Sequence, residues 1–193
     1  MIPLNVTHTA IFTSAVHRRL LSGSSSTQTP KDGVPLHLEE SLQYMPPPAT
    51  PLRHTLSTLI LFFAHTYKQT FNFVDGPPIH DALTIAYLSQ PQLFKVKRYR
   101  VDVELAGTHT TGETVVDMWN YRRLGEDSWG PDGKNCLVAE SANVSAPFSH
   151  DTQINVVPAN HLSQIPEFWD MFMLCVAKCD KVTPLNNTPV DFQ

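Results

Sequence analysis

The chain lacks an excess of positive charge and a long hydrophobic run, and both absences exclude classes of function. Its 193 residues contain 14 Lys and Arg against 18 Asp and Glu, which gives a formal net charge of −4. Because nucleic-acid binders need basic groups to neutralise phosphates, we expect no nucleic-acid partner. The most apolar run, residues 56–64, is far shorter than the ~20 residues of a membrane span, and no secretory pattern follows Met1. We therefore expect a soluble, cytoplasmic protein without a membrane partner.

Cysteine is also scarce, being present only at Cys136, Cys175 and Cys179. The last two are four residues apart, a spacing that places them on one face of a helix. A zinc site would need two more ligands in a second cluster, and the sequence has no such cluster. Because free cysteine is among the most buried residue types, we expect these thiols to be buried as small hydrophobic side chains.

The overall composition, with 41% hydrophobic and 17% charged residues, is typical of a globular domain. The length is sufficient for one domain with a sizeable core. Residues 22–50 are the exception, because they are rich in Ser, Pro and Gly and offer little to bury. We interpret them as a flexible, removable insertion with at most one turn of helix near residues 37–44.

Helical spacing of apolar residues predicts three helices. They cover residues 51–71, the stretch between the Gly-Pro-Pro turn at 76–78 and Pro91, and residues 165–179 at the end of the chain. On the first helix, the residues predicted to face inward are Leu52, Leu56, Leu59, Ile60, Phe63 and Tyr67. On the second they are Leu83, Ala86 and Tyr87, and on the third they are Ile165, Phe168, Trp169, Phe172, Cys175, Val176 and Cys179.

Strands are predicted where apolar and polar residues alternate. The clearest cases are residues 98–105 and 113–121, and residues 135–141 and 154–159 are further candidates. Because these strands stand among helical patterns, the chain is predicted to be of mixed α/β class.

Two titratable residues, His80 and Asp81, stand where the second helix begins. Neither is buried at low cost without a partner. One interpretation is that Asp81 caps the helix and that His80 is an ordinary turn histidine. The other is that the Pro-Pro turn holds both side chains rigidly at a helix N-terminus, where an acid or a metal ligand would be well placed. The spacing alone leaves both interpretations open.

Three segments resemble one known family. Residues 76–94, GPPIHDALTIAYLSQPQLF, and residues 99–117, YRVDVELAGTHTTGETVVD, resemble the C-terminal signature of the inosine/uridine-preferring nucleoside hydrolases. Residues 3–13, PLNVTHTAIFT, resemble a segment that lies upstream of that signature in the family. The order of the three segments also agrees. The resemblance implies that residues 1–193 are the C-terminal portion of a mixed, mainly parallel sheet flanked by helices.

The resemblance also implies an activity, which is Ca²⁺-dependent hydrolysis of the N-glycosidic bond of a nucleoside such as inosine or uridine, as in purine and pyrimidine salvage. His80 resembles the residue that gives a proton to the departing base, and Asp81 resembles a carboxylate ligand of the calcium ion. Tyr67 and His65 lie where the family has a flap over the base, which makes Tyr67 a candidate substrate contact. The alternative is that Tyr67 only completes the apolar face of its helix. His109 is expected to be a structural residue on a strand.

One family element is missing from the sequence. The calcium site of the family rests mainly on an N-terminal loop of the form D-x-D-x-G-x-D-D, whereas here no Asp stands within four residues of another. A lone Asp81 cannot hold Ca²⁺, which takes about 6 to 8 oxygen ligands. We therefore expect the chain to be an incomplete nucleoside hydrolase. The alternative is a non-catalytic remnant or an interaction protein that keeps the family scaffold, and assembly into a homo-oligomer stays open.

Overall fold

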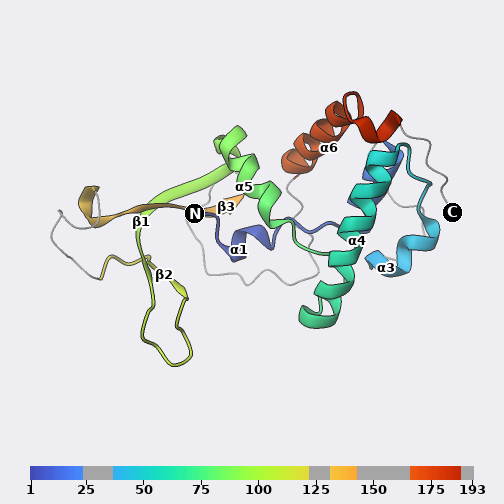
Figure 1. Ribbon diagram of the computed structural model, residues 1–193. Helices are drawn as coiled ribbons and strands as arrows, with labels where there is room; N and C mark the ends of the chain where they lie inside the picture. The colour runs from blue at the N-terminus through green and yellow to red at the C-terminus, as the bar shows by residue number, and fades with distance from the viewer. Residues whose placement is uncertain (24–36, 122–130, 143–165, 188–193) are drawn as a thin grey trace, which may run out of the picture.

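The computed structural model describes residues 1–23, 37–121, 131–142 and 166–187. Its helices are α1 (Leu4–Thr7), α2 (Ser14–Ser22), α3 (Leu38–Ser41), α4 (Pro51–Phe71), α5 (His80–Ser89) and α6 (Pro166–Asp180). Its strands are β1 (Phe94–Val103), β2 (Thr114–Asp117) and β3 (Cys136–Ala142). Helices α3, α4 and α6 gather at one end of the molecule, the sheet occupies the other end, and α1 and α5 lie between them (Figure 1).

The predicted α/β class is confirmed, with a difference in the sheet. The described strands form one three-stranded sheet in the order β2-β1-β3, and both pairs are antiparallel. A mainly parallel sheet was expected. For the pair of β1 and β2, the cause is the link between them, a hairpin whose residues 104–113 are too few for the crossover that a parallel pair needs.

The core lies between the helices and is rich in aromatic side chains. Phe12, Phe168 and Trp169 are fully buried, and the ring of Trp169 lies 4.8 Å from that of Phe168 and 6.0 Å from that of Phe12. The inward positions predicted for α6 are therefore confirmed at its start. Its second half differs, because only Val176 is buried there while Cys175 and Cys179 are exposed. The prediction that the thiols are buried is wrong for these two, because Val176 is the residue of this half of α6 that packs in the core, and Cys136 is only half-buried.

Helix α4 begins and ends at the predicted residues, but the predicted inward face is wrong in part. Leu56 and Ile60 pack against the core, whereas Leu59 and Phe63 are exposed. The fully buried positions of α4 are Arg53, Ser57 and Ala64. The face against the core is thus partly polar, which is possible because its polar groups find hydrogen-bond partners in other helices.

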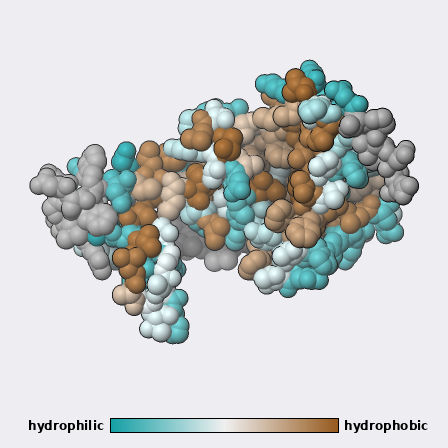
Figure 2. Space-filling model, in the orientation of Figure 1, coloured by the Kyte–Doolittle hydropathy of each residue, from teal (hydrophilic) through white to brown (hydrophobic). Residues whose placement is uncertain are grey.

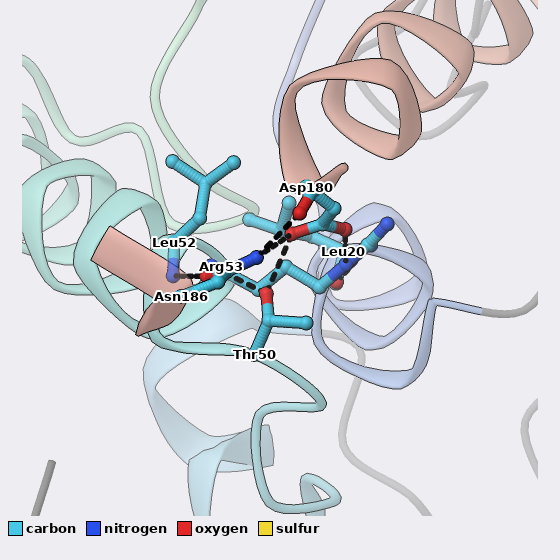
Figure 3. Close-up of polar contacts among 6 residues, drawn as sticks. All are labelled: Leu20, Thr50, Leu52, Arg53, Asp180 and Asn186. Atoms are coloured by element: carbon cyan, nitrogen blue, oxygen red, sulfur yellow. Dashed lines mark hydrogen bonds and ion pairs between the residues drawn. The ribbon is translucent and has the colours of Figure 1, made fainter. Parts of the chain in front are cut away.

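The first turn of α4 is anchored by Arg53 (Figure 3). The guanidinium donates from Nε to Asp180 Oδ2 at 2.7 Å and from Nη1 to the Leu20 carbonyl oxygen at 2.6 Å. The hydroxyl of Thr50, the N-cap residue, donates to the other Asp180 oxygen at 2.6 Å. The Asn186 amide donates to the Asp180 carbonyl oxygen at 2.8 Å. These contacts join α4 to the ends of α2 and α6.

The predicted insertion is only partly described, because residues 24–36 lie outside the described residues. The expected turn of helix is present as α3 and a following 3₁₀ turn. Leu38 of α3 is 1% exposed and belongs to the core. We conclude that the part of the insertion around α3 stabilises the fold, which differs from the expectation that it has little to bury.

Two other predicted features also lie outside the described residues, namely the strand candidate at 154–159 and the inward position Ile165. Among the helices of the described ranges, none combines the length and the apolar character that crossing a membrane requires.

Candidate functional site

The Gly-Pro-Pro turn is held against a segment near the start of the chain. The Phe12 amide donates to the Pro77 carbonyl oxygen at 2.9 Å, and the Ile79 amide donates to the Ala10 carbonyl oxygen at 3.0 Å. Gly76 has a φ of 139°, and a Cβ built on it would lie 2.1 Å from the Phe12 carbonyl oxygen. Only glycine fits at this position. Two of the three segments that resemble the family therefore lie side by side.

This pairing places His80, the first residue of α5, beside the end of α1 and the last turns of α4. His80 Nδ1 lies 2.8 Å from Thr7 Oγ1, and His80 Nε2 lies 3.0 Å from Tyr67 Oη. Both ring nitrogens of a half-buried histidine thus have hydrogen-bond partners. The structure brings together the predicted site residues His80 and Tyr67, and it adds Thr7, which the sequence analysis did not single out.

The rings of His8 and Phe73 lie close to His80 and Tyr67. The His8 ring lies 5.5 Å from the His80 ring and 5.2 Å from the Phe73 ring. The Tyr67 ring lies 6.0 Å from the His80 ring and 5.8 Å from the Phe73 ring. Partial burial, and then the charge of His80, lower the pKa of His8 from its ordinary value. His8 therefore favours the neutral state beside His80.

His8 and Phe73 were not predicted either. The only sequence signal for His8 and Thr7 was their place in residues 3–13, the segment that resembles the family. Hydrophobic periodicity does not reveal such contacts, because Thr7 and His80 are 73 positions apart in the chain.

Asp81 is exposed, and its carboxylate makes no hydrogen bond or ion pair with a described residue. The interpretation of Asp81 as the helix cap is wrong, because the N-cap residue of α5 is Ile79. Asp81 instead lies in the first turn, where a negative charge interacts favourably with the helix dipole. Within the described ranges, no group of three or more His, Cys, Asp or Glu side chains could hold a metal ion.

The other two histidines that the sequence analysis considered lie apart from His80. His65 Nδ1 is 3.3 Å from Glu39 Oε1, and Lys68 Nζ is 2.6 Å from Glu39 Oε2, so these contacts connect α4 to α3. The hydrogen bond from Lys68 is the main reason why the pKa of Glu39 is lowered. His109 is exposed in the turn between β1 and β2, so its predicted place on a strand is wrong.

Comparison with known proteins identifies the family. The sequence profile of the inosine-uridine preferring nucleoside hydrolases matches residues 1–149. The chain belongs to this family. A probable ribonucleoside hydrolase of Dictyostelium discoideum is 42% identical over 106 residues, which are 54% of this chain and 28% of that protein. The pyrimidine-specific ribonucleoside hydrolase RihA of Shewanella woodyi is 36% identical over 69 residues, which are 36% of this chain and 22% of that protein.

The nucleoside hydrolase fold is also present in a solved structure. The purine-preferring ribonucleoside hydrolase from Gardnerella vaginalis matches 95% of this chain with a TM-score of 0.58 and 18% identity, and the match covers 40% of that protein. This nucleoside hydrolase chain thus spans 22% to 40% of the length of these relatives.

Proposed function

We propose that this nucleoside hydrolase chain supplies the leaving-group side of a site that hydrolyses the N-glycosidic bond of ribonucleosides. The observation that carries the proposal is the position of His80, whose ring nitrogens are hydrogen-bonded to Thr7 and Tyr67. Glycosidic bonds break through an oxocarbenium-like transition state, in which negative charge develops on the departing group. A proton given to the base removes that charge, and histidine is the commonest side chain in this role.

In this proposal His80 is the proton donor and Tyr67 is a substrate contact. The Tyr67 hydroxyl lies 3.0 Å from His80 Nε2, so in this proposal both side chains would contact the same base. A proton passes from His80 to a base nitrogen as the electron pair of the N-glycosidic bond moves onto the base. Water adds to C1′ of the ribose and releases one proton, which replaces the proton that His80 gave. The products are ribose and the free base, which is the chemistry of purine and pyrimidine salvage, and we place it in the cytoplasm.

The described residues do not fit a complete calcium site. Asp81 offers one carboxylate, whereas Ca²⁺ takes about 6 to 8 oxygen ligands. We propose Asp81 as a single calcium ligand whose partners come from outside the described residues, and we derive no catalytic step through the metal. The substrate class follows from the names of the relatives, which include pyrimidine-specific and purine-preferring ribonucleoside hydrolases. Inosine and uridine are therefore the first substrates to test.

The test measures release of reducing sugar from inosine and uridine, with and without Ca²⁺. We expect no measurable turnover from residues 1–193 alone, and turnover from a longer version in which the Asp-rich loop of the family is restored. In that version His80→Ala should lower kcat by about 10²- to 10⁴-fold, the usual contribution of a general acid. His109→Ala is the matched control, because His109 lies in an exposed turn apart from the site.

A second candidate function is that of a non-catalytic scaffold or interaction protein. It is favoured by one observation, the lack of a metal-binding group of side chains in the described ranges. If the longer version binds neither Ca²⁺ nor inosine in calorimetry, this alternative replaces the hydrolase. Equal kcat values for the longer version and its His80→Ala variant would instead remove the leaving-group role of His80.

A further inference from the structure

We propose that Thr7 is a positioning residue that sets the tautomer of His80, so that Nδ1 carries the ring proton and Nε2 faces Tyr67 and the base. The inference rests on the proposed function for its catalytic meaning, but the hydrogen-bond geometry behind it stands by itself. Thr7 is 2% exposed, its Oγ1 lies 3.2 Å from the Leu4 carbonyl oxygen, and the same Oγ1 lies 2.8 Å from His80 Nδ1.

The direction of these bonds follows from counting protons. A carbonyl oxygen only accepts, so the single hydroxyl proton of Thr7 is the donor toward Leu4. Thr7 Oγ1 then offers a lone pair to His80, and Nδ1 must be the donor. With the proton on Nδ1, Nε2 has a lone pair that accepts from the Tyr67 hydroxyl at 3.0 Å. All three hydrogen bonds form together in this arrangement.

The opposite tautomer makes fewer bonds. If the proton were on Nε2, Thr7 would have to turn its hydroxyl toward Nδ1 and give up the contact with Leu4. Because buried donors and acceptors are nearly always hydrogen-bonded, the tautomer that forms all three hydrogen bonds is favoured. Thr7 is well suited to this role, since it belongs to a short helix that is itself held beside α5 by the pairing at Pro77 and Ile79.

The consequence for the reaction is that Nε2 is the nitrogen that exchanges a proton. Nε2 takes up a proton to form the imidazolium, passes that proton to the base as the N-glycosidic bond breaks, and returns to the form with a lone pair. Nδ1 keeps its proton and its bond to Thr7 throughout, so His80 does not need to turn its ring during the reaction. The His8 and Tyr67 rings lie 5.5 Å and 6.0 Å from the His80 ring and limit its tilt. Positioning of this kind lowers the cost of reaching the reactive geometry.

The test compares Thr7→Val, which has a similar shape without the hydroxyl, with Thr7→Ser, which keeps it. Nitrogen NMR of the full 193-residue chain reports the His80 tautomer, and a His80→Gln variant identifies its signals. The spectrum is recorded about two pH units above the ordinary histidine pKa of about 6.5, where the ring is neutral. We expect the Nδ1–H form in the original chain and in Thr7→Ser, and a shift toward the Nε2–H form in Thr7→Val.

The same spectra contain an internal control, His17, whose Nε2 lies 2.7 Å from Ser57 Oγ and which does not contact Thr7. Its signals should not change. In the longer version of the enzyme, Thr7→Val should lower kcat about tenfold, as expected for one lost hydrogen bond, with little change in KM, whereas Thr7→Ser should keep both.

Two results would overturn the proposal, namely an Nε2–H tautomer in the original chain or an unchanged His80 signal in Thr7→Val. If the His17 signals also change, Thr7→Val disturbs the whole fold, and Thr7→Ser then decides the role of the hydroxyl. Because Thr7→Ser keeps the hydroxyl, a shift of its His80 signals would contradict that role. The tautomer is read without turnover. A chain that shows the expected tautomer change but no hydrolysis in any version therefore contradicts the proposed function and not the role of Thr7.

Discussion

The two ends of α4 are built in opposite ways. At its start, Arg53 and Asp180 form an ion pair whose side chains are only 5% and 15% exposed. At its end, Tyr67 is half-buried and Phe71 is exposed. In Figure 1, α6 lies over the start of the helix and leaves its end uncovered. The start of α4 is therefore anchored in the fold, and we call it the anchored end. The last turns around Tyr67 are more exposed, and we call them the open end.

The polar groups at the two ends also differ in what they can do. Burial would raise the pKa of Asp180, but hydrogen bonds from Thr50, Arg53 and Asn186 outweigh it and hold the pKa below its ordinary value. Asp180 therefore stays ionised as the partner of Arg53. At the other end, His80 is hydrogen-bonded to the hydroxyls of Tyr67 and Thr7 rather than to a charged group.

Removing the anchor should have the largest effect on stability. Arg53→Met leaves the Asp180 carboxylate buried without its cation, so we expect a loss of about 3 to 5 kcal/mol in the free energy of unfolding. Urea unfolding measures this loss. Arg19→Met is the matched control, because Asp170, the partner of Arg19 at 2.6 Å, is 68% exposed. That variant should lose less than about 1 kcal/mol. Similar losses for both variants would contradict the comparison.

The next effect concerns the turn that supports the open end. Gly76→Ala should cost about 3 kcal/mol, because the new Cβ meets the Phe12 carbonyl oxygen at 2.1 Å and the backbone φ of 139° strains an L-residue. Gly112→Ala separates the two causes, since Gly112 has a φ of 88° but no atom within 4 Å of the added Cβ. It should cost about 1 kcal/mol. Thermal unfolding of both variants measures the difference, and equal costs would exclude the clash.

A pH effect on stability is expected from His17, which contacts the anchored half of α4. His17 packs against Ser57, and burial, followed by the charge of Arg18, lowers its pKa from 6.5 to about 4. Between about pH 4 and pH 6.5, His17 therefore binds a proton in the unfolded chain but not in the folded chain. Stability is complete above pH 6.5 and should fall by about 2 kcal/mol at pH 5.

The measurement for His17 is urea unfolding at pH 7 and pH 5 for the original chain and for His17→Gln. His8 also has a lowered pKa and contributes with the same sign, so the difference between the two proteins isolates His17. A variant that loses as much stability as the original chain between these pH values would contradict the role of His17.

The elements near the site were predictable from the sequence, because their signals are local. The bounds of α4 follow from a Thr cap, a Pro at the first position and apolar spacing. Its buried face was not predictable in the same way. Arg53 and Ser57 are polar, and they are buried only because Asp180 and His17 meet them from distant segments. Periodicity counts hydrophobic residues and gives no information about such partners.

The site was predictable only in part, for the same reason. His80 and Tyr67 were predicted as site residues through the family resemblance, and the structure brings them within 3.0 Å of each other. Thr7 and His8 were not identified, because a small hydroxyl and a surface histidine at the start of the chain carry no local signal. Their positions beside His80 depend on the pairing of residues 10–12 with residues 77–79, which joins segments far apart in the sequence.

The smallest effect is expected for an ion pair near the open end, between Lys68 and Glu39. Their atoms are 2.6 Å apart, as close as the 2.7 Å of Arg53 and Asp180, but their side chains are 36% and 33% exposed. Water screens this pair and solvates whichever group is left after substitution, so Lys68→Met should cost less than about 1 kcal/mol in urea unfolding. Added salt should reduce even that cost, whereas the cost of Arg53→Met should persist. If Lys68→Met were as destabilising as Arg53→Met, distance rather than burial would decide the strength of both pairs, and the contrast between the two ends of α4 would fail.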